Sequence, residues 1–583
     1  MNDTDRTIEN RSQYFVKAAF RRFFIPSITS SLWIALAGFA DCFLVGNSIG
    51  TNGLAAISLG QPVYLFYNIL SYGMSIGGSI HCAAKFAEGR EEEGNRIFLS
   101  VVRLLLSLYI VTAAIALIFL SPLMRLLGAD PADEVTRTYI RTQLLFVPLM
   151  FCQGPFYYFV NADNAPVLAS TAMSVSSLID IVLSYVFLIR LRIGVAGSVY
   201  STAAGAVVML CMTASHIVLK RGVLRFRMEK MDWKASLIAA RTGFSTSAQY
   251  LCEFISMIAV NRLLIHISGA AGVAAFDVVY NVSTLFAAIT DGVVVATEPM
   301  LSSYRSERNL GNIRGTLKVS LDWAYALAFI LAALLLTSAS ALTTGFGLIG
   351  EPERGYTVSG IRTYLFCAVF FVANSIFSGY YQSILREKYS YIITFLRSFV
   401  FYLPSLFICA QGGMKTFWYF FTLSEGATFL AWMIPLALRR DILQLRSIDT
   451  RNAKSVFIDS SEQELAFIIE DIQRFCEERQ CQPRQTLYIG LTIEEICSAI
   501  IERFRERMGE IYIQVTVVAD KEGCSLYIRD NAYAYNPMEE DTKKIDLKSG
   551  DKVELLGIDI VQKTAEEFYY RRYSGFNTLV LRL

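Results

Sequence analysis

Long apolar stretches dominate the first three quarters of the chain and predict membrane-spanning helices. A span needs about 20 apolar residues. Stretches of this kind cover residues 23–46, 55–84, 98–124, 139–160, 166–190, 194–219, 237–266, 273–300, 318–346, 362–385, 390–411 and 416–438. The pattern therefore predicts an all-α polytopic membrane protein with about twelve transmembrane helices.

The sequence changes character after the last apolar stretch. From about residue 447 onward, ELAFIIEDIQRFCEERQ and LYIGLTIEEICSAIIERFRERM have the spacing of amphipathic helices. The segments IYIQVTVVAD, SLYIRDN and FNTLVLRL alternate as strands do. We therefore expect a C-terminal soluble α+β domain of roughly 135 residues, an ordinary size for one domain.

Positively charged residues gather at one end of alternate spans. An excess of Lys and Arg marks the cytoplasmic side of a membrane protein. These residues are Lys17, Arg21 and Arg22 before the first span, Lys85, Arg90 and Arg96 after the second, Lys220, Arg221, Arg225, Arg227, Lys230 and Lys234 after the sixth, Arg305, Arg308 and Arg314 after the eighth, and Arg386 and Lys388 after the tenth. The pattern predicts a multi-pass protein of the cell inner membrane, in contact with the lipid bilayer, with both termini cytoplasmic.

The basic segment after the sixth span divides the membrane part into two six-helix lobes. A weak sequence similarity between ILSYGMSIGGSIHCAAKFAEGREEEGNR and AAITDGVVVATEPMLSSYRSERNLGNIR supports this division. Repeated halves place a substrate site between two bundles near the bilayer midplane. The expected organisation is a cytoplasmic leader at 1–22, an N-lobe at 23–219, a linker at 220–236, a C-lobe at 237–440, a linker at 441–454 and the soluble domain at 455–583.

Two carboxylates interrupt the apolar stretches. Asp41 lies in FFIPSITSSLWIALAGFADCFLVG, and Asp180 lies in TAMSVSSLIDIVLSYVFLI. A carboxylate in hydrocarbon costs several kcal/mol unless it faces a polar cavity, so such residues mark ion or proton pathways. The two acids predict a transporter, although Asp41 could instead cap a broken helix or bind a neighbouring hydroxyl.

Composition agrees with a membrane protein and excludes other classes. Hydrophobic residues make up 54% of the chain, and the mean hydropathy is +0.42, above what a soluble domain usually shows. The net charge of +2, with no basic block outside the loops, argues against a nucleic-acid partner. The 11 cysteines contain no CxxC pair and no metal-like spacing with the 3 histidines, so no metal site is expected.

The membrane part resembles the multidrug and toxic compound extrusion (MATE) family over residues 12–440. The resemblance rests on an ordered set of stretches: ADCFLVGNSIGTNGLAAISLGQPV, NADNAPVLAS, SLIDIVLSYVFLI with IGVAGSVYSTAAG, TEPMLSSYRSE and LRSFVFYLPSLF. It implies a cation-coupled antiporter that exports small organic cations and other amphipathic substrates. Pro26 is expected to kink the first span, and the family uses such a bend in its transport cycle.

In that family the N-lobe binds coupling H⁺ or Na⁺ through an aspartate of the first span, an Asn-x-x-x-Asp pair of the fifth and a threonine of the sixth. The matching positions are Asp41, Ser176 with Asp180, and Thr202. Residues four apart share a helix face, so Ser176 and Asp180 can face one cavity. Because Ser176 replaces the amide carbonyl that would suit a hard cation, we prefer H⁺ to Na⁺.

The C-lobe has an acid of its own, Glu253, in TGFSTSAQYLCEFISMIAV. Some MATE proteins have a glutamate here, eight residues beyond a proline that is Ser245 in this chain. Those relatives often have an aspartate in the tenth span as well, where this chain has Asn374 and Ser375. The resemblance implies a coupling role for Glu253, with a structural role as the alternative.

The soluble domain resembles the anti-sigma-factor type of GHKL nucleotide-binding domain over residues 455–583. The stretches LTIEEICSAI, IRDNAYAYNP and ELLGIDIVQK carry the resemblance. It implies that Glu494 activates water or a hydroxyl and that Asp530 reads the adenine amino group. Gly557 would belong to a lid that enters a phosphate-facing helix.

Each of these stretches departs from the family pattern. Ser498 replaces the Asn that holds Mg²⁺, Ala532 replaces a Gly, and Leu555 replaces the partner of Gly557. A side chain at the lid position hinders close approach of the backbone to phosphate. We therefore expect a retained fold without ATPase or kinase turnover, with binding of ATP and Mg²⁺ as the alternative.

These features together predict a secondary transporter with a cytoplasmic regulatory domain, not an enzyme. No cofactor is expected beyond H⁺ or Na⁺ as coupling ion. The tail is expected to dock onto a cytosolic partner, such as an anti-anti-sigma-like protein, or onto the basic inner loops around Arg225 and Lys230.

Two alternative functions remain. The chain could be a membrane-anchored sensor that acts through its C-terminal domain. It could also be a flippase for a lipid-linked precursor, which would need basic residues in the membrane; the few available are Arg103, Arg262 and Arg397.

Overall fold

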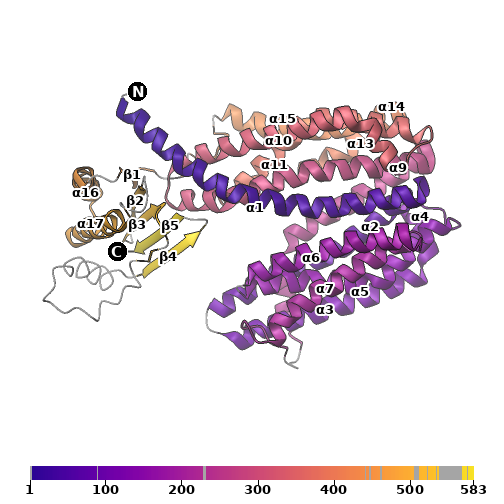
Figure 1. The fold of residues 1–583 in the computed structure, drawn as a ribbon, viewed down its shortest axis with the longest axis horizontal. Coiled ribbons are helices and arrows are strands. Elements are labelled where there is room, and N and C mark those ends of the chain that lie inside the picture. Colours follow the sequence, from indigo (N-terminus) through magenta and orange to yellow (C-terminus); the bar gives the residue numbers. More distant parts are fainter. Residues whose placement is uncertain are drawn as a thin grey trace.

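Two bundles of long helices lie side by side, and a smaller domain sits at one end of them (Figure 1). The computed structural model describes residues 3–87, 90–163, 165–226, 231–439, 441–445, 448, 450–459, 462–504, 511–520, 523–533, 535–536, 567–573 and 576–582. The first bundle contains α2 (Thr51–Ala87), α3 (Glu91–Ile118), α4 (Leu120–Leu127), α5 (Glu134–Ala162), α6 (Pro166–Tyr185), the π-helical turn η1 (Val186–Arg190) and α7 (Ala196–Val218). Helix α1 (Asp3–Ile49) precedes them in the chain and packs against both bundles.

The second bundle begins after the inter-lobe linker. It contains α8 (Trp233–Thr242), α9 (Phe244–Ser306), α10 (Leu310–Gly345), α11 (Glu353–Ser383), α12 (Glu387–Phe395), the π-helical turn η2 (Leu396–Val400), α13 (Tyr402–Ala410), α14 (Met414–Phe417) and α15 (Tyr419–Leu438). Several helices begin and end at common capping residues. Asp133 caps α5 by accepting from the Val135 N–H, and α4 ends at Gly128, whose φ of 93° favours glycine.

The helices account for the expected membrane spans. Eleven of the described helical segments are long and apolar enough to cross a bilayer. One of them, Ser247–Ser306, has 60 residues, well beyond the length that a single span needs. It changes direction at Gly269, where φ is 62°, so two expected spans form one helix broken at a glycine. The polytopic helical fold is confirmed.

The two halves share a local irregularity. The fifth span of the first half, α6, runs into η1, and the corresponding span of the second half, α12, runs into η2. Segments of π-helix are rare and often lie at functional sites. The matching positions of η1 and η2 agree with the weak sequence similarity between the two halves.

The expected leader 1–22 is not a separate segment. Helix α1 begins at Asp3 and continues without interruption into the first span. Val16 and Phe20 on this early part are buried, and the Phe20 ring lies 6.3 Å from the ring of Trp323 on α10. Packing against α10 explains why polar sequence ahead of a span remains helical.

The C-terminal domain is a five-stranded antiparallel sheet with two helices. Its elements are β1 (Ala453–Asp459), α16 (Glu462–Glu478), α17 (Pro483–Phe504), β2 (Tyr512–Asp520), β3 (Gly523–Asp530), β4 (Glu567–Tyr573) and β5 (Phe576–Arg582). The strand order is β1-β2-β3-β5-β4. An α+β domain is thus present where the alternating sequence predicts one.

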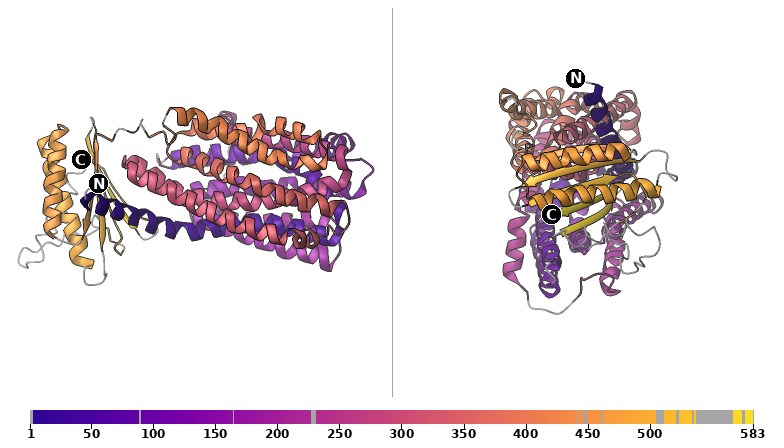
Figure 2. Two further views of the ribbon diagram at one scale, coloured as in Figure 1. Left: turned by 90° about the horizontal axis from the view of Figure 1, so that it is seen from above. Right: turned by 90° about the vertical axis from the view of Figure 1, so that its left-hand side faces the viewer.

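One face of this sheet packs on α16 and α17. Ile513, Val515, Leu526 and Ile528 alternate along β2 and β3 and join the helices in one core. Figure 2 shows the sheet between these two helices and the ends of the membrane helices. The sheet therefore has α16 and α17 on one face and the membrane helices on the other.

Candidate functional site

Asp41 is bound by hydroxyl groups that come from the fifth and sixth spans. The Ser184 hydroxyl on α6 donates to Asp41 Oδ1 at 2.8 Å. Ser184 also lies 2.6 Å from the Ser201 hydroxyl on α7, which in turn donates to the Ser198 carbonyl. A hydroxyl carries one proton, so this chain can reverse direction when the charge on Asp41 changes.

Asp180 has a second hydroxyl partner on α7. Thr202 Oγ1 lies 3.3 and 3.2 Å from the two Asp180 carboxylate oxygens and 3.0 Å from the Ser198 carbonyl oxygen. Because Thr202 has a single proton to donate, it can bind either the carboxylate or the carbonyl. The structure thus brings Asp41, Asp180 and Thr202 into one region between α1, α6 and α7.

Ser176 lies one helical turn before Asp180 and is buried. Its carbonyl faces α7, where a Cβ built on Gly205 would come within 2.7 Å of the Ser176 oxygen. This close helix contact requires glycine. Ser176 therefore has a packing role in addition to the coupling role that the resemblance implies.

A third acid, Asp277 on α9, faces α1, the helix that carries Asp41. Cys42 Sγ donates to Asp277 Oδ2 at 2.7 Å, and both side chains are 3% exposed. This contact joins α1 to the second bundle. Sequence reasoning missed Asp277, although it interrupts the apolar stretch AAGVAAFDVVYNV just as Asp41 interrupts its own span.

Glu253 lies on the first half of α9 and is half-buried. Gln249, one turn earlier, donates to its Oε1 at 3.1 Å. Pro26 lies within α1, but the placement of its side chain, like that of the Ser245 side chain, is outside the described part of the structure. The expected kink at Pro26 stays a prediction.

The C-lobe contains a buried ion pair that sequence reasoning did not assemble. Arg397 on η2 donates to Glu425 Oε1 on α15 at 3.0 and 2.8 Å, and to the Ser375 hydroxyl on α11 at 2.9 Å. Its guanidinium also lies 4.6 Å from the centre of the Phe371 ring. Two bonds from one guanidinium to one carboxylate oxygen give the pair a fixed geometry.

Asn374 completes this network. Its amide donates to Glu425 Oε2 at 2.7 Å, and its own oxygen accepts from the Trp432 indole at 2.8 Å. Asn374 is fully buried, so these bonds satisfy a polar group that could not otherwise be accommodated. Asn374, which stands where some relatives have an aspartate, is thus hydrogen-bonded to an acid of the last span, Glu425.

The ends of the two bundles opposite the C-terminal domain are joined. Asn261 on α9 donates to the Ser58 carbonyl at 2.8 Å, while the Ser58 hydroxyl donates back to Asn261 Oδ1 at 3.2 Å. Asn47 donates to the Gly345 carbonyl on α10, and Arg262 donates to the Leu126 carbonyl at 2.9 Å. The region around Asp41 is therefore closed at that end.

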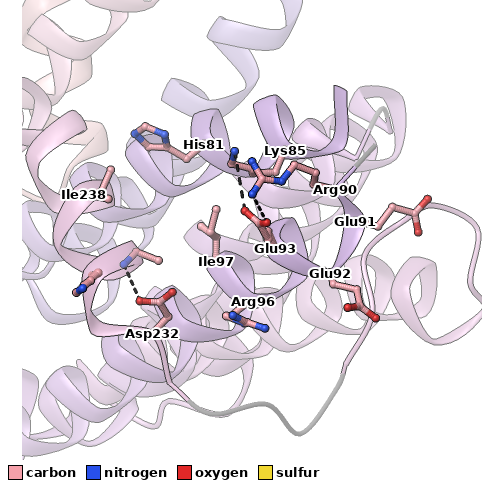
Figure 3. A pocket seen from close by; sticks show the side chains of 12 residues that line it. His81, Lys85, Arg90, Glu91, Glu92, Glu93, Arg96, Ile97, Asp232 and Ile238 are labelled. Atoms are coloured by element: carbon pink, nitrogen blue, oxygen red, sulfur yellow. Dashed lines mark hydrogen bonds and ion pairs between the residues drawn. The ribbon is translucent and has the colours of Figure 1, made fainter. Parts of the chain in front are cut away.

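A separate polar cavity of 750 Å³ opens near the inter-lobe linker (Figure 3). Arg90 and Lys85 both pair with Glu93 inside it. Its walls carry both signs of charge, which suits no single class of ion. The lining residues are His81, Lys85, Arg90, Glu91, Glu92, Glu93, Arg96, Ile97, Asp232, Lys234, Ala235 and Ile238.

The residues expected to bind nucleotide lie on two elements of the C-terminal domain. Glu494 and Ser498 are one turn apart on α17, the first exposed and the second half-buried. Asp530 ends β3 and is 3% exposed; its Oδ1 accepts from the Ala532 N–H at 2.9 Å and from the Asn577 amide at 2.7 Å. The Asn577 amide is thus already bound to the carboxylate that the resemblance assigns to adenine. Gly557 and Leu555 lie outside the described residues.

Comparison with known proteins identifies the membrane part. The MatE family model matches residues 26–186 and 243–408, more than half of the chain. The chain belongs to the MatE family. It is a membrane-embedded, multi-pass protein of a family of secondary transporters, and the resemblance of the membrane part to this family is confirmed.

Three relatives show the extent of the likeness. The "Probable multidrug resistance protein NorM" of Photorhabdus laumondii is 24% identical over 54% of this chain and 70% of its own. The "Probable multidrug resistance protein YoeA" of Bacillus subtilis is 23% identical over 49% of this chain and 65% of its own. A solved inward-facing multidrug resistance MATE family transporter of the MOP superfamily is 21% identical, with a TM-score of 0.65 over 72% of this chain and 96% of its own.

Proposed function

We propose that this transporter exports amphipathic, often cationic organic compounds in exchange for H⁺. The relatives named above are described as multidrug resistance proteins. The observation that carries the proposal is the contact between Asp41 and the hydroxyl chain of α6 and α7. Carboxylates inside spans are costly and mark ion or proton pathways.

The ligands around the acids favour H⁺ over Na⁺. Ser184 and Thr202 offer hydroxyl groups that can either donate to a carboxylate or turn away from it. Na⁺ is a hard cation and calls for several oxygens that all accept, as in other hard-cation sites. Here the hydroxyls donate to the acids, an arrangement that serves proton exchange directly.

The lipid-linked flippase finds little support in this geometry. Arg397 is engaged by Glu425, and Arg262 is engaged by backbone carbonyls at the closed end. A phosphate headgroup would have to displace these partners. Export of organic cations requires no such displacement, because these substrates carry no phosphate for the arginines to bind.

The test is transport in vesicles that contain the full chain. A pH gradient and a Na⁺ gradient are imposed separately, and ethidium movement is followed by fluorescence. We expect movement with the pH gradient alone and its loss on addition of an uncoupler. Movement that needs a Na⁺ gradient and ignores the uncoupler would assign Na⁺ instead, and no movement under either gradient would overturn the exporter.

We further propose that the C-terminal domain is a regulatory module with a GHKL-like fold and no enzymatic turnover. Its five-stranded sheet under two helices supports an α+β module of this kind. The engagement of Asp530 by Asn577 and the replacement of the Mg²⁺-binding Asn by Ser498 support a loss of catalysis.

A further inference from the structure

The second face of the C-terminal sheet is covered by the transporter itself. Phe457, Tyr512 and Phe576 pack on the apolar core of the membrane bundles, whereas their strand neighbours pack on α16 and α17. Gln514 and Thr516 on this face are 1% exposed. We call the face formed by Ser455, Phe457, Tyr512, Gln514, Thr516, Arg529 and Phe576 the docking face.

A charged pair lies at the centre of this contact. Arg529 on β3 donates to Glu307 Oε1 at 2.5 Å and to the Ser303 hydroxyl at 2.8 Å. Its guanidinium lies 4.9 Å from the centre of the Tyr304 ring. Burial alone would lower the pKa of Arg529, but the attraction of Glu307 outweighs it and holds the pKa above its ordinary value.

Glu307 is poorly placed without its partner. It is the residue that ends α9, at the negative end of the helix dipole, and it is 2% exposed. A buried carboxylate in this position needs a cation, and Arg529 of the C-terminal domain supplies it. Removal of one member of a buried pair is strongly destabilising.

Beside the three aromatic residues of the docking face, the contact contains further polar groups. Asn309, which caps α10, donates to Ser455 at 3.3 Å, and Ser455 lies 2.8 Å from the Thr516 hydroxyl. Interfaces between domains that move are more polar than permanent ones. Four of the seven residues of the docking face, Ser455, Gln514, Thr516 and Arg529, are polar and can be solvated when the domain leaves.

The location differs from the basic inner loops that the sequence suggested. Arg225 is used locally, because its guanidinium donates to the Gly222 and Leu224 carbonyls and its N–H donates to Asn95. Lys230 is outside the described residues. The docking face instead meets the end of α9 and the start of α10.

We propose that the docking face is a reversible regulatory contact, in which the Arg529–Glu307 pair holds the C-terminal domain on α9. While the domain is docked, it restrains the movement of the two lobes in the conformation whose opposite ends are joined. The same helix that ends in Glu307 carries Asp277, which meets Cys42 of α1. Strand β1 also lies beside the early part of α1 (Figure 1). The domain thus contacts one helix from each lobe, and a contact made in only one conformation favours that conformation.

The docking half of the proposal is tested by hydrogen–deuterium exchange of the full chain. Arg529→Glu and Glu307→Arg should each raise exchange at residues 303–312, the end of α9 and the start of α10 beneath the docking face, at least tenfold, because a like-charged pair replaces the buried ion pair. The double variant restores the pair with its charges reversed and should return exchange to within about twofold of the parent. Asp471→Asn removes the Lys454–Asp471 pair between β1 and α16 and should leave exchange at 303–312 unchanged. Full protection in both single variants would overturn the dock.

The regulatory half rests on the proposed transport function. Both single variants should export ethidium at least twofold faster than the parent in the same vesicles, and the double variant should match the parent. Single variants that undock but export at the parent rate would overturn the regulation and leave the exporter intact. If even the parent fails to export, the proposed function and the regulatory half both fail, while the dock is judged from exchange alone.

Discussion

At the scale of single residues, the candidate site depends on where hydroxyl protons point. Ser184 can donate to Asp41 or to Ser201, and Thr202 can donate to Asp180 or to the Ser198 carbonyl. A negative carboxylate attracts the proton, and a neutral one releases it. Each acid therefore has a local partner that changes its hydrogen bond when the acid gains or loses a proton.

Neutralising either acid should stop coupled transport. Asp41→Asn and Asp180→Asn keep the shape of the side chain but cannot bind and release a proton, so we expect gradient-driven ethidium efflux to fall at least tenfold. Asp322→Asn, at an exposed position on α10, is the matched control and should export normally. Parent-rate efflux from both site variants, with normal expression, would refute the coupling site.

Asp277 should matter for the same reason. Asp277 is buried, so its carboxylate needs either a proton of its own or the hydrogen bond from the Cys42 thiol. Asp277→Asn should therefore slow efflux several-fold, whereas Cys42→Ala should have a smaller effect because it leaves the acid in place. Equal rates for Asp277→Asn and the parent in a vesicle assay would restrict Asp277 to packing.

Part of this site could be predicted from the sequence and part could not. Asp41, Asp180 and Thr202 stand out because polar groups in apolar stretches are few and family motifs surround them. Asp277 meets the first of these criteria and could have been found in the same way. The Arg529–Glu307 pair has no such signal, since each residue has the sequence context of an ordinary surface charge and 222 positions separate them.

At the scale of helices, the C-lobe is held together by one polar network. Arg397 on η2, Glu425 on α15 and Asn374 on α11 join three helices through bonds that fix their relative register. Hydrogen bonds between membrane helices supply such register where lipid gives none. The network therefore defines how the last helices of this lobe fit together.

Breaking this network on one side should destabilise the protein. Arg397→Met leaves Glu425 buried without its cation, and loss of one partner costs about 3–5 kcal/mol. We expect a clear fall in the melting temperature of the purified protein in detergent. Arg397→Met combined with Glu425→Gln should recover much of it. Arg190→Met, at the exposed arginine of η1, is the control and should change the melting temperature little.

The joined ends of the bundles should act as a gate. Ser58 and Asn261 exchange two hydrogen bonds across the lobes, so cysteines at both positions should form a disulfide. Oxidation of the Ser58→Cys, Asn261→Cys protein should arrest transport, and a reductant should restore it. Each single cysteine variant should be insensitive to oxidant. Undiminished transport by a fully cross-linked protein would show that these ends need not separate.

Hydrophobic patterning predicts the helices better than their ends. The spans follow from apolar length alone, which is why a polytopic helical fold could be predicted from the sequence. The continuity of α9 through Gly269 and the helical leader on α1 were not predicted. Both depend on packing between distant segments, such as Phe20 against Trp323, which a local pattern does not contain.

At the scale of the whole molecule, a two-lobed transporter is combined with a C-terminal α+β domain, for which we propose a regulatory and not an enzymatic role. We expect no Mg²⁺-dependent ATP hydrolysis by the purified full chain, because Ser498 replaces the metal-binding Asn and Asn577 engages Asp530. Phosphate release should be the same for the parent and Glu494→Ala. ATP turnover that disappears in Glu494→Ala would restore an enzymatic role to the domain.

The connection between the two parts is short and partly fixed. Tyr380 and Tyr381 on α11 donate to the carbonyls of Leu443 and Ile442 at 2.9 and 2.6 Å, so the chain is held on α11 as far as Leu443, and β1 begins at Ala453. A short tether keeps a binding partner at an effective concentration in the millimolar range. A contact too weak to form between separate molecules can then be occupied most of the time. A detached copy of the domain, added at micromolar concentration, would not displace the tethered one.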